Sequence, residues 1–248
     1  MTSLIRSEVL KLRTARSFIV LVSVGVGLIS LLSLATTLFA KYSPDAPSPG
    51  VDLISNASAV ALFTLMLGVL SITTEFRNGS IASTLLVEPN RTRLLAAKLV
   101  AVIAAGALIG LLTSGIALLM GAAIFPSRGY SLGLDGSEVV ELIAGTTAAG
   151  ALMAAVGVGI GALVRAQTPA IVGILVYLFV VEPLLTFLVS SSDQYVLGSA
   201  LSELTGTGGD NGIDDPLGQV PGGLLLLGWA ALFAVLGAVV MRARDVTD

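Results

Sequence analysis

The sequence predicts an all-α integral membrane protein with six transmembrane helices. Of its 248 residues 55% are hydrophobic and only 12% are charged, and the mean hydropathy is +0.96. Soluble domains typically contain about 25% charged residues. The apolar residues also form six long runs, and a helix needs about 20 such residues to span a bilayer. We therefore expect residues 1–248 to form a single transmembrane domain in a lipid bilayer.

The first segment, residues 1–17, predicts an interfacial helix. On a helical wheel its apolar residues share one arc, and basic residues flank that arc, which is typical of a helix lying on a membrane. The apolar set is Leu4, Ile5, Val9 and Leu12, and the basic set is Arg6, Lys11 and Arg13. Glu8 falls inside the apolar arc, where a carboxylate is costly unless it has a partner.

The six apolar runs give the expected spans. They cover residues 18–40, 53–74, 94–125, 138–164, 169–189 and 223–241. The first is too long for the apolar core of a signal peptide. The third would be roughly 48 Å long as one helix, so we expect it to tilt or to project from the bilayer. The longest polar stretch, residues 190–222, begins with a modestly apolar patch that predicts a short helix.

The basic residues predict the orientation. If the N-terminus is inside, eleven of the 13 Lys and Arg residues lie on the inner side, and only Lys41 and Arg128 lie outside. Cytoplasmic segments carry such an excess of positive charge. We expect a multi-pass protein of the bacterial plasma membrane, with both termini in the cytoplasm and residues 190–222 outside.

Several kinds of chemistry are missing from the sequence. It contains no Cys and no His, which excludes thiol chemistry, disulfides and His-based acid–base catalysis. A phosphate-binding P-loop needs Gly-Lys followed by Ser or Thr, and none of the three lysines is followed by either residue. Acidic residues near Asp210 lack the spacing of a calcium-binding loop, because Asp215 stands where Gly is required. We expect no catalytic residues, metal site, bound cofactor or nucleic-acid partner for this chain.

A charged segment, residues 75–93, separates the second and third apolar runs. Asn78-Gly79 indicates a turn, and Ser80 can cap a helix that follows it. Pro89 disfavours helix at the residue before it. Three apolar residues share one side of the intervening stretch: Ile81, Leu85 and Leu86. The pattern predicts a short amphipathic helix held between two spans.

This segment resembles the coupling segment of ABC-2 family transporter permeases. Their pattern is Glu-aromatic-Arg, a small hydroxyl residue, an apolar helix, Pro, a basic pair and a Lys entering the next span. The matching residues are Glu75, Phe76, Arg77, Gly79, Ser80, Pro89, Arg91, Arg93 and Lys98. Ser80 stands where the family more often has Thr. The run from Glu8 to Arg13 also looks like the family's N-terminal segment. The other interpretation of residues 75–93 is an ordinary basic cytoplasmic loop.

The resemblance implies a type V ABC exporter-like fold and a set of partners. Two permease subunits, as a homodimer or a related heterodimer, would combine with two ATPase subunits that hold ATP and Mg. Export of a drug, antibiotic, lipid or other amphipathic molecule is implied. The alternatives are an ABC-type membrane subunit serving assembly or sensing, an ion-coupled secondary transporter, and an intramembrane enzyme. The secondary transporter would need several ionisable groups at mid-membrane, and only Glu182 lies well inside a span.

The charges at the membrane boundary suggest an ion pair. An unpaired charge there is costly, so we expect Glu75 to pair with Arg77 or with a basic residue of the N-terminal helix. Glu8 would take Arg77 in the second case. Such a pair would fix the angle of the coupling helix. The other interpretation is that these charges are interface anchors that contribute little singly.

Two features lie inside the spans. Glu182-Pro183 places an acid in an apolar helix, which by default suggests a functional site that lines the substrate path or forms a gate. The alternatives are a Glu that reaches the outer interface and a Glu that bonds to backbone freed by a kink at Pro183. Glycines one helical turn apart, Gly106 with Gly110 and Gly157 with Gly161, predict close helix packing within one bundle or across a dimer.

Overall fold

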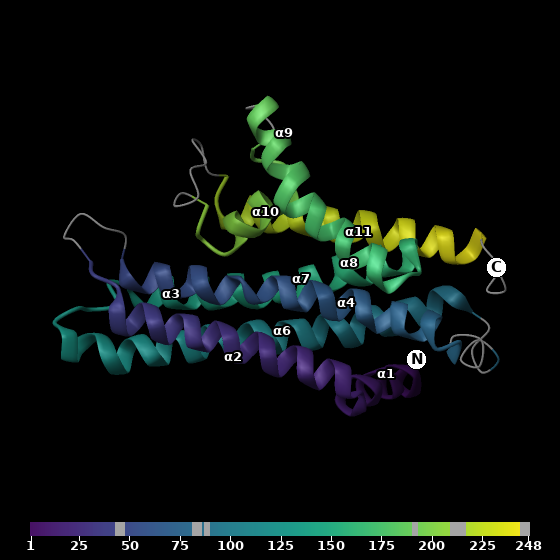
Figure 1. The fold of residues 1–248 in the computed structure, drawn as a ribbon, viewed down its shortest axis with the longest axis horizontal. Helices are drawn as coiled ribbons and strands as arrows, with labels where there is room; N and C mark the ends of the chain where they lie inside the picture. The colour runs from purple at the N-terminus through teal and green to yellow at the C-terminus, as the bar shows by residue number, and fades with distance from the viewer. Residues whose placement is uncertain (43–47, 81–85, 87–89, 190–192, 209–216, 244–248) are drawn as a thin grey trace.

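The computed structural model describes residues 1–42, 48–80, 86, 90–189, 193–208 and 217–243, and all regular structure in these ranges is helical (Figure 1). Six helical stretches are long and apolar enough to cross a membrane. They are Arg16–Phe39, Pro49–Arg77, Arg91–Arg128, Gly136–Val164, Gln167–Leu188 and Gln219–Ala243. Each begins and ends within four residues of an apolar run predicted above.

The N-terminal segment is a separate helix, α1 (Thr2–Thr14), which precedes α2 (Arg16–Phe39). Ala15 joins them in an extended conformation, with φ −75° and ψ 118°, so the two helices cannot continue as one. α1 packs against the start of α6 and buries Glu8 there. Its position in a membrane interface stays a prediction.

The second and third spans are long and nearly unbroken. The second consists of α3 (Pro49–Ser58) and α4 (Val60–Arg77), and Pro49 occupies the start of α3, where the missing N–H costs nothing. The third is α6 (Arg91–Ile124), which continues into the 3-10 turn η1 (Phe125–Arg128). Asn90 caps α6 because its side chain accepts a hydrogen bond from the Arg93 amide. The extra length of α6 lies beside α1.

The central helix of the bundle is α7 (Gly136–Val164), which packs most extensively against α4, α6 and α11. Small residues make these approaches possible. A Cβ atom on Gly157 would collide with the Leu65 carbonyl of α4, and one on Gly106 of α6 would collide with the Gly150 carbonyl. The glycine pairs therefore pack within one bundle, which confirms the first of the two arrangements expected for them.

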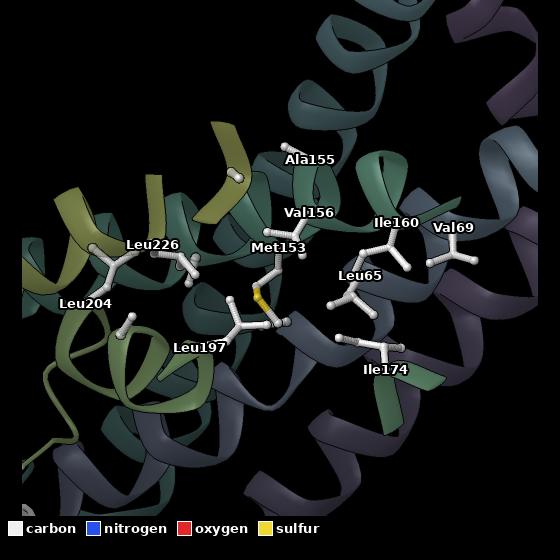
Figure 2. Packing of buried hydrophobic residues seen from close by; sticks show 14 of the residues in the cluster. Leu65, Val69, Met153, Ala155, Val156, Ile160, Ile174, Leu197, Leu204 and Leu226 are labelled. Atoms are coloured by element: carbon white, nitrogen blue, oxygen red, sulfur yellow. The ribbon is translucent and has the colours of Figure 1, made fainter. Parts of the chain in front are cut away.

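A buried apolar cluster joins α7 to four other helices (Figure 2). Its labelled members come from α4, α7, α8 (Gln167–Val176), α10 (Leu197–Leu204) and α11 (Gln219–Ala243). They are Leu65, Val69, Met153, Ala155, Val156, Ile160, Ile174, Leu197, Leu204 and Leu226. The short helix predicted in the 190–222 segment is α10, and its burial on α7 and α11 fixes it to the bundle.

The fifth span is irregular. It runs through α8, the π-helical turn η2 (Tyr177–Val181) and α9 (Glu182–Leu188). Pro183 has no N–H, and its ring excludes the carbonyl one turn earlier, so a regular helix cannot pass this point. Figure 1 shows α9 directed away from the parallel helices.

The bundle has two ends that differ in content. The α1 end holds α1, the end of α4, the start of α6, the turn between α7 and α8, and the end of α11. The other half, which we call the α10 end, holds the start of α3, the start of α7 and, nearer the middle of the bundle, α10 (Figure 1).

Candidate functional site

Four charged side chains meet at the α1 end, where α1 lies against α4 and α6. Lys98 Nζ of α6 donates to Glu8 Oε2 at 2.5 Å and to Glu75 Oε1 at 3.0 Å. Lys11 Nζ of α1 donates to Glu8 Oε1 at 2.6 Å and to Glu75 Oε1 at 2.8 Å. The two carboxylates and two ammonium groups thus alternate in a ring, which we call the ion network.

The ion network is largely withdrawn from solvent. Glu8, Glu75 and Lys98 are buried, whereas Lys11 is partly exposed. Lys98 also donates to the Ser71 carbonyl at 3.0 Å, so all three of its N–H groups are used. A buried charge is costly unless it is paired and hydrogen-bonded, and the network meets both conditions with a net charge of zero.

The two network members on α1 have shifted pKa values. Burial raises the pKa of Glu8, but the charge of Lys98 and the hydrogen bond from Lys11 outweigh it, and the pKa lies below its ordinary value. Burial lowers the pKa of Lys11, but hydrogen bonds to Glu75 and Glu8 outweigh it, and the pKa is raised. Both shifts favour the charged forms at neutral pH.

Glu75 has one of the two partnerships expected for it. It pairs with Lys11 of the N-terminal helix, whereas Arg77 donates to the Gln167 side chain at 2.7 Å. The expected pairings of Arg77 with Glu75 or with Glu8 are therefore wrong. Residues two apart do not face each other on a helix, and Arg77 faces α8 instead.

Sequence reasoning placed Lys98 in the coupling pattern but missed it as a partner of the acids. The available signal was its place near the start of an apolar span. A lysine in such a helix requires a carboxylate or backbone carbonyls, and Glu8 was already marked as an acid without a partner.

Two arginines at the same end bind the last turn of α11. Arg91 donates to the Met241 carbonyl at 2.8 Å, and Arg165 donates to the Val240 carbonyl at 2.9 Å. The guanidinium of Arg165 also lies 5.3 Å from the centre of the Phe76 ring. Helix C-termini present unpaired carbonyls and a partial negative charge, so these contacts stabilise the end of α11. The aromatic residue of the coupling pattern thereby contacts the turn between α7 and α8.

The other residues of the coupling pattern lie around the end of α4. Gly79 has a φ of +68°, which glycine adopts without strain, and it turns the chain after Arg77. Ser80 Oγ lies 3.5 Å from the Glu75 carbonyl. Leu86 is 87% exposed, and the Arg13 and Arg93 side chains are also exposed. Three expected members, Ile81, Leu85 and Pro89, lie outside the described residues, so the coupling helix stays a prediction.

Glu182 lies at the opposite end of the bundle and is buried. Its Oε1 accepts a hydrogen bond from the Gly198 amide at 2.6 Å. This amide belongs to the first turn of α10, which has no side-chain cap of its own. Glu182 therefore caps α10 from another helix. Its hydrogen bond goes to an α10 amide and not to backbone freed by Pro183, so that alternative is wrong, whereas its position relative to the outer interface stays a prediction.

Glu182 and Pro183 line a cavity of about 570 Å³. The cavity lies between the junction of α3 and α4, the fifth span and α10. Its volume falls within the range of small-molecule sites, roughly 300–1,000 Å³. The role of these two residues in a substrate path or gate remains a prediction.

Comparison with known proteins gives one match. A family model described as ABC-2 family transporter protein matches residues 4–205. No curated protein matches the chain. The matched residues include the whole ion network, Glu182 and all of α10.

Proposed function

The chain belongs to the ABC-2 family of transporter membrane proteins, and on that premise we propose that it is the permease subunit of an ATP-driven exporter. Family membership makes it a multi-pass membrane component of an ABC transporter that works with an ABC ATPase subunit. The finer proposal is that two permease subunits, identical or related, combine with two ATPase subunits. ATP and Mg bind to those partners, and the cargo is a drug, antibiotic, lipid or other amphipathic molecule.

The ion network is the observation that carries the coupling part of this proposal. Glu75 is near the end of α4, and Lys98 is near the start of α6, so the network flanks the 75–93 segment on both sides. Lys11 and Glu8 add α1 to the same unit. A force applied to the segment by an ATPase would therefore move α1, α4 and α6 together.

Further contacts extend this unit to three more spans. Arg77 ties the end of α4 to the start of α8, and Arg91 ties the start of α6 to the end of α11. Arg165 joins the end of α7 to α11 and stacks on Phe76. All of these contacts lie at the α1 end of the bundle. A movement of the 75–93 segment can therefore reach five of the six spans. These contacts support a role in coupling.

Orientation is part of the proposal. The α1 end would face the cytoplasm of a bacterial cell, where the ATPase subunits and the positive-inside rule both place it. Arg13 and Lys41 are exposed at opposite ends, and the chain contains no Cys. In intact cells a membrane-impermeant thiol reagent should label Lys41→Cys and not Arg13→Cys. The reverse labelling would contradict the orientation.

The test of coupling uses Glu75→Ala in the complex co-purified with its ATPase and placed in lipid nanodiscs. We expect the complex to assemble, because Lys98 keeps its bond to Glu8. We expect its ATPase rate to fall towards that of the ATPase subunit alone, and transport to stop. Arg13→Ala, which removes an exposed charge from α1, is the matched control. ATPase activity and transport both unchanged in Glu75→Ala would refute the coupling role.

A further inference from the structure

Glu182, which lines this cavity, has a carboxylate oxygen with no partner. Oε1 accepts from the Gly198 amide, whereas Oε2 is buried and has no hydrogen-bond partner in the described part of the protein. The residue is 7% exposed and lines the cavity. An unsatisfied buried carboxylate oxygen is costly, so a ligand that supplies a donor or a positive charge would be favoured there.

The walls of the cavity are suited to an amphipathic ligand. Hydroxyl groups are its main polar lining, from Ser55, Ser58, Thr186, Ser199, Ser202 and Thr205. Apolar side chains complete it, from Leu62, Met153, Leu178 and Phe179. None of the described lining residues is Lys or Arg. The cavity therefore offers one negative charge, several hydroxyl oxygens and an apolar surface.

The charge of the surrounding end has the same sign. The acidic residues described at the α10 end are Asp52, Asp135, Glu138, Glu141, Glu182, Asp193 and Glu203. The basic residues described there are Lys41 and Arg128. Arg128 is engaged with the carbonyls at the end of α2, at 2.6 Å from Thr37 and 2.8 Å from Ala40. The summed field at this end attracts cations.

We propose that this cavity binds the cationic group of an amphipathic organic cation, with the Glu182 carboxylate as its counter-ion. The hydroxyl groups would solvate the edge of the cationic group, and the apolar residues would hold the rest of the ligand. This inference rests on the proposed function only in taking the ligand to be cargo, and it narrows the cargo to cations.

Capping alone does not account for this arrangement. A Ser, Thr, Asp or Asn at Val196 would cap α10 locally, as is usual for helices. Here the cap comes from a buried acid on another span, which leaves one oxygen without a partner in the described residues. The π-helical turn η2 ends at Val181, directly before that acid, and such turns frequently occur at functional sites.

The test uses two probes of the same shape and opposite charge, tetraphenylphosphonium and tetraphenylborate. Purified full-length protein in nanodiscs of uncharged lipid is equilibrated with each probe, and binding is measured against empty nanodiscs. We expect saturable binding of the cation only. Glu182→Gln should weaken it about tenfold or more, because the negative charge that attracts the phosphonium is lost. Equal binding of both probes, or wild-type affinity in Glu182→Gln, would overturn the proposal.

The chain offers a matched control. Glu203 is also buried on α10, with Oε2 bonded to the Gly218 amide at 2.8 Å and Oε1 without a partner in the described chain, but it does not line this cavity. Glu203→Gln should leave cation binding unchanged. A loss as large as that of Glu182→Gln would show that general negative charge, and not this site, binds the probe, and would also overturn the proposal.

A second variant avoids the α10 cap. Ser55 is exposed and lines the cavity, so Ser55→Phe should obstruct it while the bundle folds normally. We expect it to reduce tetraphenylphosphonium binding as strongly as Glu182→Gln does, and full binding would contradict the site. These measurements need neither ATPase nor transport. A failed coupling experiment would therefore leave the cation site standing, and a failed binding experiment would leave the exporter proposal standing.

Discussion

The two ends of the bundle treat buried carboxylates differently. At the α1 end Glu8 and Glu75 meet two lysines from α1 and α6, and the ion network is neutral. At the α10 end Glu182 and Glu203 meet backbone amides, and each keeps one oxygen without a partner in the described residues. The first arrangement joins three helices through side chains, whereas the second holds loops and helix ends.

The difference separates a structural connection from a binding site. A closed set of charges gains little from an outside ligand, because nearly all its donors and acceptors are used. Glu75 Oε2 also lacks a hydrogen-bond partner, but two lysines already neutralise that carboxylate, whereas no lysine or arginine is among the described residues lining the cavity beside Glu182. The α1 end is therefore suited to transmitting force, and the α10 end is suited to receiving a cation. The predictions below test this contrast, beginning with the largest effect.

Removing Lys98 should have the largest effect on stability. Lys98→Met leaves Glu8 and Glu75 buried with only Lys11 between them. Loss of one partner from a buried ion pair typically costs about 3–5 kcal/mol of unfolding free energy. Unfolding of the purified protein in detergent, followed by circular dichroism, measures the loss. Lys41→Met, at an exposed lysine, is the control. Equal unfolding midpoints for the two variants would mean that the ion network does not stabilise the α1 end.

The two acids of the network should differ from each other. Both oxygens of Glu8 accept from lysines, whereas only Oε1 of Glu75 does. In Glu8→Gln the new NH₂ group must face an ammonium, which we expect to cost about 2 kcal/mol. In Glu75→Gln it can take the place of the unpartnered Oε2, at a cost of about 1 kcal/mol or less. The same unfolding experiment ranks them, and equal losses would contradict the hydrogen-bond pattern.

Much of the fold could be predicted because it depends on local composition. The six helices follow from six apolar runs, and close packing at Gly106 and Gly157 follows from small residues one turn apart. The break at Pro183 likewise follows from a missing N–H. Each of these features is encoded within a single helix, so no knowledge of its neighbours is required.

The site was harder to predict because its contacts join distant segments. Glu8 and Lys98 are 90 residues apart, and no local pattern links them. Sequence analysis considered Arg77 for Glu75 because it is near in the chain, but the helix turns it towards α8. Glu182 was identified as unusual, yet its use as the cap of α10 depends on Val196, which lacks a capping side chain. The missing cap was the available signal.

Substitutions at Glu182 should separate its two oxygens. Glu182→Gln keeps an oxygen for the Gly198 amide, so we expect little change in stability. Glu182→Ala removes the cap of α10 and should cost about 1 kcal/mol. Hydrogen exchange of the α10 amides should be faster in the Ala variant and unchanged in the Gln variant. Equal exchange in both variants would mean that Glu182 does not hold α10. The carboxylates at the α10 end would then not serve as helix caps, and the comparison between the two ends would be wrong.

The smallest expected effect is that of pH. The contribution of the ion network to the free energy of unfolding should be nearly constant around neutrality. The pKa of Glu8 is lowered, so its contribution is present above its ordinary pKa of about 4.3 and is lost as pH falls through the folded value.

The pKa of Lys11 is raised, so its contribution is present below about pH 10.4 and is lost as pH rises through the folded value.

Between about pH 6 and 9 we therefore expect the wild-type protein and Glu8→Gln to differ in unfolding midpoint by a constant amount, because both groups keep their charge throughout. Below about pH 4 the difference should shrink, because Glu8 of the wild type becomes protonated. It then lacks, as Gln does, the negative charge that pairs with the two lysines. Lys11→Met provides the matching comparison on the alkaline side, where its deficit should shrink only at high pH. A difference that changed steadily between pH 6 and 9 would mean that Glu8 and Lys11 titrate there, and the closed network could not then serve as a constant mechanical connection.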